Sequence, residues 1–195
     1  PKPRPRPKPK PKKMTPEEVD RIVEWARRAA DGRRYTRPTG DNVKDLLARV
    51  EKDYPDHPSA VRLRKRIIAG LYKRYRRAVR RKRYSTAAAR LRAWIALDPE
   101  AERPQVKLTL LHVNQGKRAL ARRKYRLAAA HARSALRVIP DSPRALELTG
   151  DIFSRRRRYA QALKHYELAA EAPKVSRRYK RKLLRKIRTT KRKVR

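Results

Sequence analysis

The side chains of this sequence that could do chemistry are arginines and lysines, gathered in short runs that each end on a tyrosine. The runs are R-R-K-R-Y at 80–84, R-R-K-Y at 122–125 and R-R-R-R-Y at 155–159, with a weaker G-R-R-Y at 32–35. Guanidinium groups can grip a phosphate at two points, where lysine offers a point charge. The runs therefore predict anion-binding turns.

The overall charge points to a polyanion as the partner. The chain has 195 residues, of which 59 are Lys or Arg and 18 are Asp or Glu, for a formal charge of +41. A compact state with this charge repels itself at low salt, so we expect a polyanion to neutralise it. Nucleic acid is the first candidate, bound through its backbone, because the sequence has no helix-turn-helix, zinc-finger or aromatic-rich RNA-binding signature.

The positive charge is concentrated in three zones: an N-terminal arm, a long helix with its turn, and the C-terminal helix. Residues 1–13 alternate proline with cations, which predicts an extended arm that lies along phosphates or serves as a stiff linker. Residues 61–92 contain fourteen cations and no acid, whereas 14–60 contain nine cations and ten acids. The cations that we expect to contact the polyanion are Lys2, Arg4, Arg6, Lys8, Lys10, Lys73, Arg74, Arg76, Arg77, Arg80, Arg81, Lys82, Arg83, Arg122, Arg123, Lys124, Arg155, Arg156, Arg157, Arg158, Arg177, Arg178, Lys180, Arg181, Lys182, Arg185, Lys186 and Arg188.

Catalysis is not expected. The chain has no cysteine, its four histidines form no ligand cluster, and no Gly-rich phosphate loop or serine-nucleophile motif occurs. We therefore predict no enzyme activity, no cofactor and no small-molecule substrate. No apolar run approaches the roughly 20 residues that span a bilayer.

The elements that must position the basic runs are predicted to be helices, because apolar residues recur at helical spacing and no segment alternates at period two. Thr15 followed by Pro16, Glu17 and Glu18 is typical of a helix start. Trp25 and Trp94 are expected to pack between helices, and Tyr72 and Tyr75 either pack likewise or stack on exposed bases. Further helix starts are expected near Asp41, Ser59, Ser85, Pro104, Ala128 and Ser142, with ends near Tyr54, Pro99, Arg123, Val138 and Pro173.

A repeat of 34 residues relates the last two helix pairs. It places Gly116 on Gly150, Tyr125 on Tyr159, Ala128 on Ala162, His131 on His165 and Ala135 on Ala169. With Phe153, Tyr166 and Pro173, this pattern resembles the tetratricopeptide repeat (TPR) family, including bacterial members. The resemblance implies an all-α solenoid of about four helix-turn-helix units: a basic arm at 1–14, repeats at 15–174 and a basic capping helix at 175–195 with a stripe of Tyr179, Leu183 and Ile187.

The resemblance also gives the basic runs a common position, the turn inside each helix pair. The family usually places a glycine and an acidic or polar residue before the turn tyrosine, whereas this chain has Arg157 and Arg158, and Arg123 and Lys124. Stacked repeats would align such turns in one basic edge. The alternatives are a protein-interaction scaffold and a binder of anionic membrane or polysaccharide surfaces.

Two further expectations concern assembly and location. A repeat array with similar ends can stack head to tail, so nucleic acid could organise the protein into a filament or coat. The start at Pro1 favours removal of an upstream segment, by export or by a cut made in preparing the sequence, with the cytoplasm or nucleoid as the alternative location.

Overall fold

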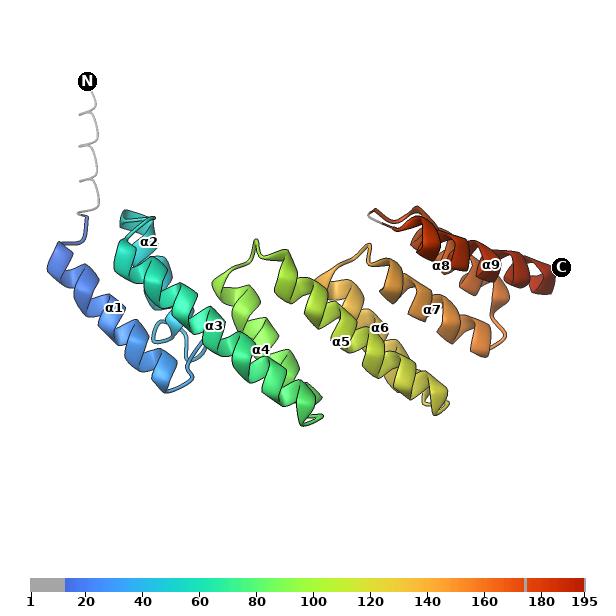
Figure 1. The fold of residues 1–195 in the computed structure, drawn as a ribbon, viewed down its shortest axis with the longest axis horizontal. Helices are drawn as coiled ribbons and strands as arrows, with labels where there is room; N and C mark the ends of the chain where they lie inside the picture. The colour runs from blue at the N-terminus through green and yellow to red at the C-terminus, as the bar shows by residue number, and fades with distance from the viewer. Residues whose placement is uncertain (1–12, 174, 195) are drawn as a thin grey trace, which may run out of the picture. The chain divides into compact units, whose positions relative to one another are not determined.

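A computed structural model describes residues 13–173 and 175–194, which form nine α-helices and no strand (Figure 1). The all-α, TPR-like prediction is therefore confirmed. The described residues divide into two compact units, one up to residue 73 and one from residue 74. The helices are α1 (Pro16–Asp31), α2 (Val43–Asp53), α3 (Pro58–Arg80), α4 (Tyr84–Leu97), α5 (Glu102–Ala121), α6 (Tyr125–Val138), α7 (Pro143–Arg155), α8 (Tyr159–Glu171) and α9 (Arg177–Val194).

Helix α1 begins where the sequence predicts it. The Thr15 side chain accepts a hydrogen bond from the Glu18 N–H, and the Glu18 carboxylate accepts one from the Thr15 N–H, which completes a capping box. The buried face of α1 consists of Val19, Ile22, Val23, Ala26 and Ala29. Trp25 is 45% exposed, so its predicted packing role is wrong. It lies at the edge of the apolar face, because it is three residues after the buried Ile22 and four before the buried Ala29.

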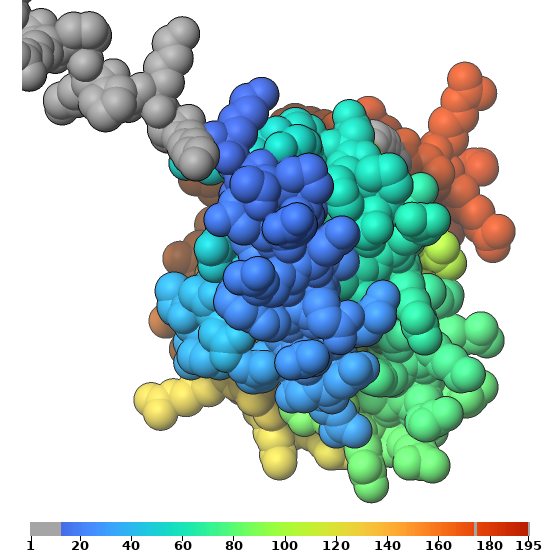
Figure 2. Space-filling view, turned by 90° about the vertical axis from the view of Figure 1, so that its left-hand side faces the viewer, coloured from blue at the N-terminus to red at the C-terminus, as the bar shows by residue number. Residues whose placement is uncertain are grey.

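Between α1 and α2, the turn is longer than the later ones and contains an ion pair. Arg34 forms an ion pair with Asp41, and Tyr35 is buried. Asn42, and not the predicted Asp41, caps α2, because its side chain accepts from the Asp45 N–H. In Figure 2 the blue surface of α1 and the light-blue surface of this turn are in direct contact.

The N-terminal end of the described chain is tied to this unit. The Met14 N–H donates to Asp53 at 3.1 Å, and the Tyr54 hydroxyl donates to the Met14 carbonyl at 2.7 Å. Met14, predicted as the last residue of the arm, therefore belongs to the folded part. The arm cations Lys2, Arg4, Arg6, Lys8 and Lys10 lie outside the described residues.

In the second unit, consecutive helices from α4 to α9 pack on one another, and α5 also packs on α7. Helices α4, α6 and α8 each begin on the turn tyrosine, earlier than the predicted Ser85 and Ala128. Helix α3 begins at Pro58, one residue before Ser59, and α5 begins at Glu102, two residues before Pro104. Proline is accepted in the first turn because the amide hydrogen that it lacks has no helical partner there.

Glycines at the repeated position allow the helices of the second unit to approach closely. A Cβ on Gly116 would lie 2.5 Å from Cδ2 of Leu148, and one on Gly150 would lie 2.5 Å from the Tyr166 ring. Helix α9 closes this core: Leu183 and Ile187 are buried against α8, and Tyr179 packs beside them. The stripe predicted for the C-terminal helix is therefore present.

Candidate nucleic-acid interface

Three turns of the second unit, α3–α4, α5–α6 and α7–α8, share one backbone geometry. The residue two before the tyrosine has a left-handed backbone in each, with φ of 57°, 57° and 59° at Lys82, Arg123 and Arg157. The next N–H donates to the carbonyl five residues earlier, and the left-handed residue donates three residues back. This is the Schellman arrangement that ends helices. The longer bonds are Arg83 to Ala78, Lys124 to Ala119 and Arg158 to Phe153, each 2.9 Å.

Glycine is the usual residue at this position, because a Cβ makes the left-handed conformation unfavourable by about 1 kcal/mol or more. Lys82, Arg123 and Arg157 occupy it instead. The chain therefore keeps a cation at three places where glycine would be locally more stable.

The charges of these turns are open to solvent. Every residue of 80–83, 122–124 and 155–158 is exposed. Among the residues that the structure describes, none of these cations forms an ion pair. The three turns lie at the lower ends of their helices in Figure 1. The predicted clusters are thus exposed as the anion-binding interpretation requires.

The turn tyrosines bring further cations to this edge. The Arg118 guanidinium donates to the Tyr84 hydroxyl and lies 5.0 Å from its ring centroid. Lys193, near the end of α9, lies 5.4 Å from the ring centroid of Tyr159. The sequence prediction missed Arg118. The 34-residue spacing of Tyr84 and Arg118, one repeat length, is the signal that could have found the first contact.

Two cations predicted at the interface are used inside the fold. Lys182 and Lys186 lie 2.8 and 2.7 Å from the buried carboxylate of Glu147, and Lys186 also lies 2.5 Å from Asp151. Burial by itself would raise the pKa of Glu147, but hydrogen bonds from Lys182, Lys186 and Tyr179 lower that pKa to about 2. Both lysines dock α9 on α7. Glu147 and Asp151 are four residues apart, as are Lys182 and Lys186. This matching spacing is the feature of the sequence that could have indicated ion pairs between the two helices.

The arginines of α9 remain exposed. Arg178, Arg181, Arg185 and Arg188 follow one another at steps of three and four residues, so they share a helix face. In the described part of the chain, none of them has a carboxylate partner. Arg177 and Lys180 are exposed beside them. This part of the predicted interface is available to an anion.

The cations predicted in the C-terminal part of α3 are exposed, whereas its two tyrosines are partly covered. Lys73, Arg74, Arg76 and Arg77 are exposed, while Tyr72 and Tyr75 are half-buried. The amine of Lys107 lies 6.0 Å from the centroid of the Tyr75 ring. Lys107 therefore lies near the Tyr75 ring on which a nucleic-acid base would have to stack.

In residues 13–173 and 175–194, no three His, Cys, Asp or Glu side chains are grouped to hold a metal ion. Within the same residues, no helix combines the length and apolar character needed to cross a membrane. His112 and His131 lie with ring centroids 5.8 Å apart, and burial, with nearby Arg92, lowers the pKa of His112 to about 4.

The paired helices and their turns define a helical-repeat protein of the TPR-like class. A family model described as "Bacterial transcriptional activator domain" (BTAD) matches residues 44–152, more than half of the chain, and the chain belongs to that family. The match includes the α3–α4 and α5–α6 turns and ends within α7, before α8 and α9.

The chain is also similar in fold to a solved TPR structure. The crystal structure of the P58(IPK) TPR domain aligns with 92% of this chain at 16% identity and a TM-score of 0.43. The chain spans 48% of the length of that structure. No curated protein matches the sequence.

Proposed function

We propose that this protein binds the phosphate backbone of nucleic acid without sequence preference and performs no catalysis. The contacts come from turns 80–83, 122–124 and 155–158 and from the exposed arginines of α9. The observation that carries the proposal is the left-handed cation in each turn, because a solvated turn has no need of a cation where glycine is more stable.

Nucleic acid suits these turns better than a small anion does. Three exposed clusters without carboxylate partners can each neutralise phosphates and release condensed counterions. Such contacts position a protein on the backbone and read no bases. The matching family is named for bacterial transcriptional activators, and proteins that activate transcription work close to nucleic acid.

The test is a binding titration with fluorescently labelled single- and double-stranded DNA and RNA of random sequence at several salt concentrations. The turn variant R81Q/R122Q/R156Q removes one exposed cation from each cluster and leaves the left-handed residues in place. Each lost phosphate contact should reduce the slope of log affinity against log salt by about 0.7 to 0.9. We expect weaker binding and a slope that falls by about two to three.

A matched control removes the same charge from the first unit. The variant R27Q/R28Q/R49Q also loses three exposed cations, two of which pair with Glu24 in α1. It should bind almost as the wild type does. Equal weakening by both variants would show that net charge alone attracts the ligand. Failure of the wild type to bind at moderate salt, with binding to acidic vesicles or polysaccharide instead, would overturn the proposal.

A second candidate function, protein binding, rests on a separate hollow of about 450 Å³ between the start of α5 and the α6–α7 connection. Val106, Leu110, Ile139 and Pro143 line it, and Val106 is 44% exposed. A peptide with an apolar anchor would fit this surface. Val106→Asp should abolish binding of such a partner and leave nucleic-acid binding unchanged.

Head-to-tail assembly stays a prediction. Electron micrographs of the protein mixed with long nucleic acid should show continuous filaments or coats. Dispersed particles on the nucleic acid would contradict it.

A further inference from the structure

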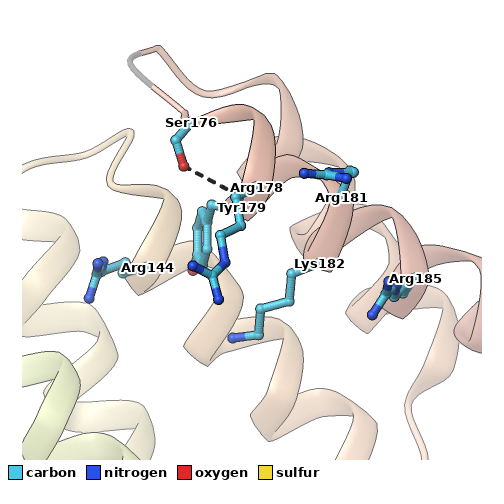
Figure 3. Close-up of a pocket in the computed structure, with 7 residues that line it drawn as sticks. All are labelled: Arg144, Ser176, Arg178, Tyr179, Arg181, Lys182 and Arg185. Carbon is cyan, nitrogen blue, oxygen red and sulfur yellow. Dashed lines mark hydrogen bonds between the residues drawn. The ribbon is translucent and has the colours of Figure 1, made fainter.

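An open cleft of about 580 Å³ lies between the start of α7 and the first turns of α9, away from the three basic turns (Figure 3). Arg144 reaches it from α7. Arg178 and Lys182 point from α9 toward the same side, and Arg181 and Arg185 follow further along α9. Cations from two helices therefore line one hollow.

The nearby carboxylates do not neutralise the arginines of this cleft. Glu147, which is 1% exposed, is contacted by Lys182 and Lys186 and lies 3.8 Å from Lys117. In the described residues, neither Glu147 nor any other acid forms an ion pair with Arg144 or with the arginines of α9. The lysines satisfy the buried acid, and the arginines keep their charge for a ligand.

The walls of the cleft are held by interactions inside the fold. The Tyr179 hydroxyl donates to Glu147 at 2.5 Å, which fixes the ring between the helices. The Arg144 guanidinium lies 5.9 Å from the centroid of this ring, and the Lys182 amine lies 5.4 Å from it. Cations placed over an aromatic ring are ordered before a ligand arrives, so less conformational entropy is lost on binding.

The start of α9 adds to the positive field in the cleft. The Ser176 side chain accepts from the Tyr179 N–H, and no acid occupies the first turn of α9. Helix N-termini carry a partial positive charge, which acidic residues usually balance. Here Arg177 and Arg178 stand in their place, so an external anion would supply the missing negative charge.

We infer that this cleft binds a phosphate monoester, either the terminal phosphate of a nucleic-acid strand or a free phosphate compound. A monoester carries nearly two negative charges and three strong acceptor oxygens at neutral pH, whereas each backbone diester carries one charge. Converging arginines therefore favour the end of a strand over its interior. The nucleic-acid form of this inference rests on the proposed function.

The test compares oligonucleotides that differ only in a terminal phosphate or hydroxyl, at the 5′ end and at the 3′ end. The wild type should bind one phosphorylated form about fivefold more tightly than its hydroxyl counterpart. Arg144→Gln should remove this preference. The control Arg133→Gln, which removes an exposed cation from α6, should keep it. Calorimetry with inorganic pyrophosphate gives a second arm that does not depend on nucleic acid.

The outcomes separate this site from the proposed function. A terminal-phosphate preference lost in Arg144→Gln supports the cleft, with the strand end as its ligand. Equal oligonucleotide binding, with pyrophosphate binding lost in the same variant, supports the cleft with a free phosphate ligand. No preference and no pyrophosphate binding overturns the inference, while salt-dependent binding of the hydroxyl oligonucleotides would still support the proposed function. Pyrophosphate binding without any oligonucleotide binding would retain the cleft and reject the proposed function.

Discussion

Arg33 and Arg157 have the same left-handed backbone, φ 59° in each, but their turns differ in charge balance. Beside Arg33, Arg34 pairs with Asp41 and the chain continues through a longer connection to α2. Around Arg157, four consecutive arginines are exposed, with no carboxylate partner among the described residues. The backbone therefore tolerates arginine in both units. The turns differ because an acid pairs with the arginine next to Arg33, whereas, in the part of the chain that the structure describes, all four arginines around Arg157 are left without a carboxylate partner.

The first turns of α1 and α9 also differ in charge between the two units. Helix α1 begins with a capping box and with Glu17 and Glu18 in its first turn, as the helix dipole favours. Helix α9 begins with Arg177 and Arg178. Departures from local stability in the second unit coincide with exposed positive charge, which is the relation expected at a binding surface.

The largest expected effect is on the carboxylates that hold each unit together. Glu147→Ala removes the acceptor of the Tyr179 hydroxyl and the partner of Lys182, and it leaves the half-buried Lys186 with Asp151 alone, so the second unit should lose about 3 kcal/mol of stability. The matched change Glu51→Ala removes the partly exposed ion pair with Arg64 and should cost the first unit less than about 1 kcal/mol. Hydrogen exchange measured by mass spectrometry resolves the two units. Equal losses would contradict the contrast.

Acid should weaken the second unit first. The pKa of His112 is about 4, below its usual 6.5, because of burial and the nearby Arg92 and His131. The folded protein binds fewer protons at His112 than the unfolded chain does between these two pH values. The stability that neutral His112 contributes is therefore fully present above pH 6.5 and is lost as the pH falls to 4. Glu147 causes a further loss of stability below pH 4.5. Burial would raise its pKa, but hydrogen bonds from Lys182 and Lys186 outweigh burial and lower it, so protonation of Glu147 is easier in the unfolded chain.

In His112→Gln, the decrease in the free energy of unfolding between pH 6.5 and 4 should be smaller by about 2 kcal/mol. The decrease below pH 4.5 that is due to Glu147 should remain. Urea unfolding followed through the buried Trp94, with the exposed Trp25 replaced by Phe, measures this change in the second unit. If the variant loses as much stability between pH 6.5 and 4 as the wild type does, groups other than His112 cause the loss.

The smallest expected effects are at the helix starts. Arg177→Glu restores the favoured charge at α9 and should stabilise the second unit by about 0.5 kcal/mol, while it weakens polyanion binding. Glu18→Gln in α1 should destabilise the first unit by a similar amount and leave binding unchanged. Calorimetric melting with a parallel binding titration checks both. Loss of stability in Arg177→Glu would argue against a functional reason for these cations.

Most of the fold could be predicted from the sequence because apolar spacing, proline positions and the 34-residue repeat agree on the helices. Cap identity could not, since Asp41 and Asn42 are both good caps and the pairing of Asp41 with Arg34 decides between them. Exposure of Trp25 depends on which face its neighbours leave uncovered.

The candidate site was predictable in part. Runs that end on tyrosine marked the turns, but the left-handed backbone at Lys82, Arg123 and Arg157 was hidden because the residues there are not glycine. The four-residue spacing of Lys182 and Lys186 matches that of their acidic partners. It does not specify how α9 packs on α7, on which these ion pairs and the cleft at Arg144 depend.

The most direct test of the central claim measures stability and nucleic-acid affinity together in the variant K82G/R123G/R157G, beside R33G. Glycine relieves the left-handed strain, so each change should stabilise its own unit, by up to about 1 kcal/mol. We predict that the triple variant is more stable than the wild type and binds nucleic acid more weakly, with a lower salt slope, whereas R33G gains stability alone. A triple variant that is more stable and binds as tightly as the wild type would contradict the account.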